Sequence, residues 1–179
     1  MKETLLTNFL LDFGLLLVPL LFIILVEKKK PTLKEFGFKT KGAIEDMALS
    51  SKIFLALLVY SFLLSFLFFI IGINDFQGVQ EGIQSIVELS PLLLIYFFIV
   101  RVFLEEYFFR AFLVPRVGVV VSSVLFGLTH YGYGSVGEII GAIFLGMILA
   151  IAYKQHGRIL PNFVGHLLYN LVAISFLVA

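Results

Sequence analysis

Long apolar runs alternate with short polar connections along this chain. A helix needs about 20 mostly apolar residues to cross the hydrocarbon core of a bilayer. Six runs approach or reach that length, the fourth and fifth being the shortest: residues 5–26, 52–73, 91–114, 117–131, 136–153 and 160–178. Most charged residues lie in the connections between these runs. The pattern therefore predicts an all-α fold, a polytopic membrane helical bundle of about six transmembrane helices.

Composition supports the same fold class. Apolar residues make up 60% of the 179 residues and charged residues 14%, and the mean hydropathy is +1.07. Ordinary soluble domains do not have such a composition. Because most of the length is committed to the bilayer, we expect residues 1–179 to form a single membrane domain, with the lipid bilayer as a partner and no nucleic acid. The absence of cysteine excludes disulfides, thiolate catalysis and Cys-based metal sites.

Basic residues are spread unevenly over the connections. They gather in connections of one parity, at 28–52, Arg116 and 154–158, whereas the opposite connections, 74–90 and 131–135, contain no Lys or Arg. Since basic loops stay in the cytoplasm, this asymmetry predicts that both termini are extracytoplasmic. Compact size and the lack of sorting signals favour a multi-pass protein of a prokaryotic plasma membrane.

Four charged residues interrupt the third apolar run, and Glu105, Glu106 and Arg110 lie together near its middle while Arg101 lies one turn earlier. Burying an ionisable group at bilayer depth costs several kcal/mol, so such groups usually mark a working site. On a helix, Glu106 and Arg110 share a face and are expected to pair, while Glu105 projects about a quarter turn away with its carboxylate free. Arg101 also stands one helical turn from Glu105, and it either pairs with Glu105 or points toward another helix or the outer surface.

Two further pairs of side chains share helix faces in later runs. Phe126 precedes His130 by one turn and could hold the imidazole by stacking, and His166 precedes Asn170 by one turn. A single polar residue in a membrane helix often only bonds to a neighbouring helix. Charged or polar pairs on three separate helices instead indicate a chemical centre. By contrast, His156 lies in a connection and is expected to be solvated.

Glu138 is the remaining carboxylate of the later runs. It stands three residues after Ser135, which is the spacing of a capping box at the start of the fifth helix. The spacing therefore predicts a capping role for Glu138, with no part in catalysis.

The chemistry open to such a centre is the activation of water. A carboxylate with a histidine can take a proton from water as it attacks a carbonyl, and a second His with an Asn can donate hydrogen bonds to the resulting oxyanion. That is peptide hydrolysis without a cofactor or a covalent intermediate. The alternative is a zinc site, in which Glu105, His130 and His166 hold Zn²⁺ with one position open for water. No His-Glu-x-x-His spacing demands zinc.

The ordered motifs resemble those of a known family. The motifs are Glu105-Glu106-x-x-x-Arg110, Phe126-x-x-x-His130 and His166-x-x-x-Asn170. They are similar to the three motifs of the CAAX-protease and bacteriocin-processing (CPBP) family, also called Abi proteins, which includes the type II CAAX prenyl endopeptidases. The resemblance covers residues 91–179, the expected catalytic core, whereas residues 5–73 give two generic helices and a Lys-rich cytoplasmic loop.

The resemblance implies a role for each motif residue. Glu105 is the implied general base of an intramembrane glutamic protease, and His130 helps to position the water. His166 and Asn170 form the implied oxyanion site. The implied supporting residues are Glu106, Arg110 and Phe126.

The predicted function is that of an intramembrane endopeptidase. Its substrate is a membrane-associated or lipidated peptide or protein, cut in CAAX-type or leader- and bacteriocin-type processing. The same family includes bacteriocin self-immunity proteins, so one alternative is an immunity or scaffold protein without catalysis. A proton-coupled transporter is the other, because Glu and His chains inside membranes also relay protons.

Overall fold

In the computed structural model, which describes residues 2–178, every regular element is a helix. Segments labelled η have turns wider or tighter than those of an α-helix. The elements are α1 (Lys2–Leu25), α2 (Ala43–Ile71), α3 (Gln77–Leu89), α4 (Pro91–Tyr96), η1 (Phe97–Arg101), α5 (Val102–Glu105), η2 (Glu106–Leu113), α6 (Val114–Leu128), η3 (Thr129–Tyr133), α7 (Val136–His156) and α8 (Ile159–Val178). The predicted all-α bundle is confirmed.

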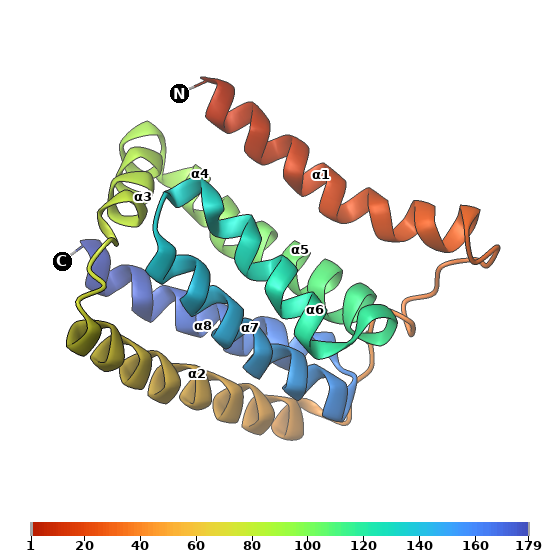
Figure 1. The fold of residues 1–179 in the computed structure, drawn as a ribbon. Coiled ribbons are helices and arrows are strands. Elements are labelled where there is room, and N and C mark those ends of the chain that lie inside the picture. Colours follow the sequence, from red (N-terminus) through yellow and green to blue (C-terminus); the bar gives the residue numbers. More distant parts are fainter. Residues whose placement is uncertain (1, 179) are drawn as a thin grey trace.

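Five helical stretches of the described chain are long and apolar enough to cross a membrane. The third of these, Phe97–Tyr133, is broken at Gly118, where φ is 82° and ψ is 175°. Residues with a Cβ rarely adopt this conformation, so glycine permits the sharp turn. The chain folds back there, and α6 runs antiparallel to α5 and η2 (Figure 1). The stretch therefore forms two arms, as the separate apolar runs 91–114 and 117–131 predicted.

Two elements differ from the expected ranges. Helix α2 begins at Ala43 rather than near residue 52, and its first turn contains a buried acidic residue, Asp46. Residues 74–90, expected only as a connection, contain helix α3. Its residues Val79 and Ile83 are buried on one face, as their one-turn spacing dictates.

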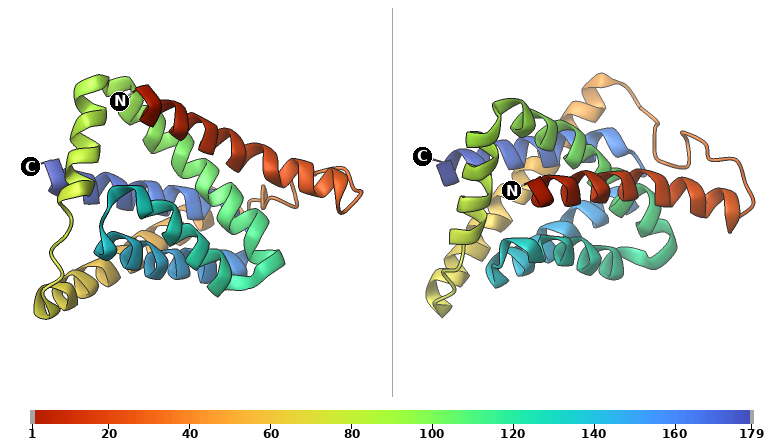
Figure 2. Two further views of the ribbon diagram at one scale, coloured as in Figure 1. Left: turned by 45° about the horizontal axis from the view of Figure 1, so that its top comes forward. Right: turned by 90° about the horizontal axis from the view of Figure 1, so that it is seen from above.

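The two ends of the bundle have different charge. Both termini lie at the same end as the α2–α3 connection and η3, while the Lys-rich connection and the turn at Gly118 lie at the other end (Figures 1 and 2). Ion pairs tie the basic end together: Arg116 Nη2 lies 2.7 Å from Glu27 Oε1, and Arg158 pairs with Asp46. The connections rich in Lys and Arg therefore lie together at one end of the bundle.

The Lys-rich connection packs into the basic end of the bundle. Phe36 is buried and stacks on Tyr107, with 4.4 Å between ring centroids. The Gly37 carbonyl accepts a hydrogen bond from the Ile159 amide at 3.0 Å. Residues 27–42 form turns and irregular structure with no regular helix. This connection thus covers the end of the bundle beside Glu106.

Helix α7 starts with a double cap. The Ser135 hydroxyl accepts the Glu138 amide hydrogen at 2.9 Å, which is the Ser135 half of the predicted capping box. Among the described residues, the Glu138 carboxylate accepts no hydrogen bond from the Ser135 amide, so the predicted capping role of this side chain is not observed. Asp75, from the connection before α3, accepts hydrogen bonds from the Val136 amide at 2.5 Å and the Ser135 hydroxyl at 3.0 Å. A carboxylate at a helix N-terminus is stabilised by the unpaired amides there. Asp75 therefore fixes the α2–α3 connection to the start of α7.

Candidate active site

Glu106 is the centre of the buried polar cluster, with a fully enclosed side chain (0% exposed). Its Oε1 lies 2.9 Å from His166 Nδ1, and its Oε2 accepts a hydrogen bond from Asn162 Nδ2 at 3.0 Å. Arg110 Nε lies 3.6 Å from Oε1. Because an ionised carboxylate only accepts hydrogen bonds, Nδ1 of His166 carries the proton in this contact. The Glu106–Arg110 pair expected from the helix spacing is present.

Arg110 is as deeply buried as Glu106, at 1% exposure. Its guanidinium carbon lies 4.1 Å from the centroid of the Phe126 ring, and none of its nitrogens makes a hydrogen bond within the described chain. Gly146 of α7 makes room for that ring, since a Cβ there would lie 2.9 Å from Phe126 Cδ1. The Arg110 charge is thus offset by the Glu106 carboxylate and by the face of an aromatic ring.

Glu105 has the opposite surroundings. It is half-buried and makes no hydrogen bond or ion pair with any described residue. Arg101 does not pair with it: Arg101 forms an ion pair with Asp12 of α1 and donates a hydrogen bond to the Asn8 carbonyl. Of the two positions that the sequence left open for Arg101, the structure therefore has the one in which it points toward another helix. The Glu105 carboxylate stays unpaired beside the charge of Arg110.

His130 lies in η3 and contacts Phe126 in two ways. Its Nδ1 is 3.1 Å from the Phe126 carbonyl oxygen, and the two rings meet edge to face with 5.0 Å between centroids. The Phe126 ring also meets His166, with 6.0 Å between centroids. A hydrogen bond from Nδ1 to a carbonyl leaves Nε2 of a neutral imidazole as an acceptor. Phe126 therefore lies between both histidines and Arg110.

Asn170 is half-buried and makes no hydrogen bond with a described residue. The carboxamide that contacts Glu106 belongs instead to Asn162, which the sequence analysis missed. Asn162 stands one turn before His166, so an N-x-x-x-H spacing inside an apolar run was the available signal. His156, expected to be solvated, is half-buried, and its Nδ1 accepts the Arg158 amide hydrogen at 3.1 Å.

A metal-binding arrangement was the alternative for this site. Over the described residues, no three His, Cys, Asp or Glu side chains lie close enough together to hold a metal ion. Glu105, His130 and His166 therefore do not form a ready ligand set in this conformation.

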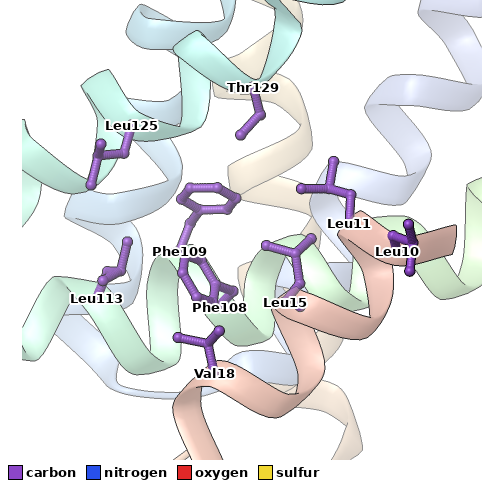
Figure 3. A pocket seen from close by; sticks show the side chains of 10 residues that line it. Leu10, Leu11, Leu15, Val18, Phe108, Phe109, Leu113, Leu125 and Thr129 are labelled. Carbon is purple, nitrogen blue, oxygen red and sulfur yellow. The ribbon is translucent and has the colours of Figure 1, made fainter. Parts of the chain in front are cut away.

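An apolar pocket of about 420 Å³ lies between α1 and the antiparallel arms η2 and α6 (Figure 3). The residues that line it are Leu10, Leu11, Gly14, Leu15, Val18, Phe108, Phe109, Leu113, Leu125 and Thr129. Thr129 is the one hydroxyl among them, and its Oγ1 lies 3.4 Å from Nδ1 of the adjacent His130. The pocket is separate from the Glu106 cluster but reaches the neighbourhood of His130.

The protein is thus a multi-pass helical membrane protein with a buried polar centre. Paired Glu, Arg, His and Asn side chains lie in the apolar interior of its bundle. Residues 87–172 match the family of type II CAAX prenyl endopeptidases described as Rce1-like. The matched segment contains all seven residues proposed for the site, and this similarity supports the family resemblance of the three motifs. No curated protein and no solved structure matches the chain.

Proposed function

We propose that this protein is an intramembrane endopeptidase in which Glu105 activates water to hydrolyse a peptide bond of a membrane-associated or lipidated substrate. One observation carries the proposal. Within the segment that matches the peptidase family, Glu106 is engaged by His166, Asn162 and Arg110, while the adjacent Glu105 makes no hydrogen bond or ion pair with a described residue. An unpaired carboxylate inside an apolar bundle is costly, so it is expected to have a chemical use.

In the proposed reaction, Glu105 takes a proton from water as the water oxygen attacks the scissile carbonyl. His130 orients that water through Nε2, because its Nδ1 is engaged by the Phe126 carbonyl. The C–N bond then breaks, and the proton held by Glu105 passes to the leaving amine. Water is thus divided between the new carboxyl group and the new amine, with no covalent enzyme intermediate.

The oxyanion of the tetrahedral intermediate needs hydrogen-bond donors in a site without bulk water. His166 donates Nδ1–H to Glu106, so Nε2 of a protonated ring is a second donor. Asn170, whose side chain is not engaged by a described residue, supplies the other proposed donor. Glu106 and Arg110 therefore support His166.

The apolar pocket supports a lipidated substrate. At about 420 Å³ and lined almost entirely by hydrocarbon, it suits part of an apolar chain. A chain lying there with its polar end at Thr129 would bring the attached peptide next to His130. We further propose that the basic end of the bundle faces the cytoplasm of a prokaryotic cell, because Lys and Arg gather there.

The test is cleavage of quenched-fluorescent lipidated peptides by the wild-type protein and by Glu105→Gln, each with and without a strong zinc chelator. Glu45→Gln, at an exposed carboxylate in α2, is the matched control. Chelator-resistant cleavage that is lost only in Glu105→Gln supports the glutamate mechanism. Cleavage abolished by the chelator would favour zinc held by Glu105, His130 and His166.

Absence of cleavage in every sample would contradict the endopeptidase proposal and favour the other predicted functions. Proton flux in liposomes that is lost in Glu105→Gln would then indicate a transporter. A biological effect retained by Glu105→Ala would indicate an immunity or scaffold protein.

A further inference from the structure

Asn162 ties three helical segments together through one side chain. It lies in the first turn of α8 with 0% exposure, and its Nδ2 donates to Glu106 Oε2 at 3.0 Å and to the Leu149 carbonyl at 2.9 Å. Glu106 belongs to η2 and Leu149 to α7. Both hydrogens of Nδ2 are used, and a flipped amide would place Oδ1 against two acceptors. The orientation of the carboxamide is therefore determined by its partners.

The other end of this carboxamide meets His156. Oδ1 of Asn162 and Nε2 of His156 are buried atoms without an aligned hydrogen bond in the described chain, although the two side chains interact. The Arg158 amide donates to His156 Nδ1, so a neutral His156 ring carries its hydrogen on Nε2. Because the two side chains interact and each of these atoms lacks another partner, the Nε2 donor and the Oδ1 acceptor are the matching pair.

These contacts form one directed chain of donors. His156 points its N–H toward Asn162, Asn162 donates to Glu106, and His166 donates to the second oxygen of Glu106. The chain begins at the connection between α7 and α8, where the Arg158–Asp46 ion pair holds the basic end together. It ends at the His166 ring in the candidate site.

We infer that Asn162 is a positioning residue: it fixes the rotation of the Glu106 carboxylate and thereby the orientation and protonated nitrogen of His166, and His156 holds Asn162 in place. The kinetic consequence rests on the proposed function, whereas the effect on His166 does not. A purely structural Asn162 would act through the Leu149 carbonyl alone, joining α8 to α7 without affecting His166.

Two nearly isosteric substitutions separate these roles. Asn162→Thr keeps one hydroxyl that can donate to Glu106, and Asn162→Val has the same shape without a donor. Since hydrogen bonds to charged groups are the stronger ones, we expect kcat to fall roughly 10- to 100-fold in Asn162→Val and much less in Asn162→Thr. KM should stay unchanged in both variants, because Asn162 does not touch the substrate.

Ser122→Ala is the control for loss of a buried hydrogen bond. Ser122 is 1% exposed and donates to the Phe109 carbonyl at 2.5 Å, away from Glu106. Its kcat should match that of the wild type. Equal kcat values for the Thr and Val variants would overturn the inference, whatever their folded yield.

A second measurement does not depend on activity. In ¹⁵N-histidine-labelled protein in detergent, the Nδ1–H signal of His166, identified by its loss in His166→Gln, should shift or broaden in Asn162→Val and be largely restored in Asn162→Thr. This result without any peptidase activity would reject the proposed function and keep the inference. A His166 signal identical in wild type and Asn162→Val would overturn the inference even in an active enzyme.

The part played by His156 is tested by a double-mutant cycle. His156→Phe keeps the ring and removes the donor, and we expect it to lower kcat about two- to tenfold in the wild-type background. In the Asn162→Val background it should have no further effect, because the acceptor is already gone. Additive losses would show that His156 acts independently of Asn162.

Discussion

Glu105 and Glu106 are neighbours in the chain, yet their surroundings are opposite. Glu106 is fully enclosed and contacts an arginine, a histidine and an asparagine, whereas Glu105 is half-buried without a hydrogen bond. Successive residues on a helix diverge by about 100°, which is enough to place one carboxylate in the packed interior and the other outside it. One carboxylate is stabilised by partners, and the other makes no hydrogen bond or ion pair with a described residue.

The difference in burial explains why the two carboxylates need different neighbours. A buried charge without compensation destabilises a fold, so Glu106 requires Arg110 and its hydrogen-bond donors. Wide helical turns begin at Glu106, and such turns are frequent at functional sites. In the proposed reaction Glu105 works with His130, whose Nδ1 is engaged by the Phe126 carbonyl. Under the proposed function, the Glu106 surroundings hold the site together and the Glu105 surroundings receive the substrate and water.

The largest expected effect is the loss of activity in Glu105→Gln. A general base contributes about 10²- to 10⁴-fold, so kcat should fall by that order while the thermal unfolding midpoint in detergent stays unchanged. Glu106→Gln is the comparison variant and should lower both kcat and stability. A Glu105→Gln protein that unfolds at markedly lower temperature would show that Glu105 is structural too.

Arg110→Ala tests whether the buried Glu106 carboxylate depends on its ion pair. It removes the cation that compensates a fully buried carboxylate, so the free energy of unfolding should fall by about 3–5 kcal/mol and the yield of folded protein should drop. Adding Glu106→Gln to the same chain should recover part of that loss, because the uncompensated charge is then gone. Wild-type stability of the single variant in chemical denaturation would contradict the pairing.

Arg101 lies one turn before Glu105 but forms an ion pair with neither glutamate. Arg101→Leu leaves Asp12 buried without its ion pair, and we expect a loss of about 1–3 kcal/mol in the free energy of unfolding, with kcat unchanged. The double variant Asp12→Leu with Arg101→Leu should regain stability, since both charges are replaced by apolar groups. A changed pH profile of kcat in Arg101→Leu would return Arg101 to the site.

The smallest effect is expected far from both glutamates, at Asp75. Burial raises the pKa of this carboxyl group, but hydrogen bonds from the Val136 amide, the Ser135 hydroxyl and the Gly137 amide outweigh it and leave the pKa below its ordinary value. A lowered folded-state pKa adds stability above the unfolded-state pKa, and that stability is lost as the pH falls through the folded-state pKa.

Thermal unfolding of wild type and Asp75→Asn should therefore differ most at neutral pH, with the wild type more stable, and converge in strong acid. A constant difference across the acid range would show that the charge of Asp75 is not what stabilises the start of α7.

Local patterns predicted much of this molecule. The apolar runs marked the membrane helices, the one-turn spacing of Glu106 and Arg110 predicted their ion pair, and Ser135 with Glu138 marked the start of α7. Helix α3 was missed because it is short and mixed in polarity, with Val79 and Ile83 as its buried face. The apolar-run criterion does not detect such a helix.

The partners that meet across the bundle were not predicted. Asn162 and His166 reach Glu106 from 56 and 60 positions away in the chain, respectively. Arg101 had one candidate partner on its own helix, but its ion pair is with Asp12 on α1. His156 is partly enclosed by the contacts that form when α7 meets α8.

The sequence alone determined that the chain is a membrane-spanning helical bundle with three motif pairs, because hydrophobic length and one-turn spacing are local properties read along one helix. The tertiary structure alone decided which glutamate is enclosed, which asparagine holds it and where Arg101 points. Those choices depend on how helices from distant segments pack, and burial makes each pairing depend on neighbours that no single helix contains.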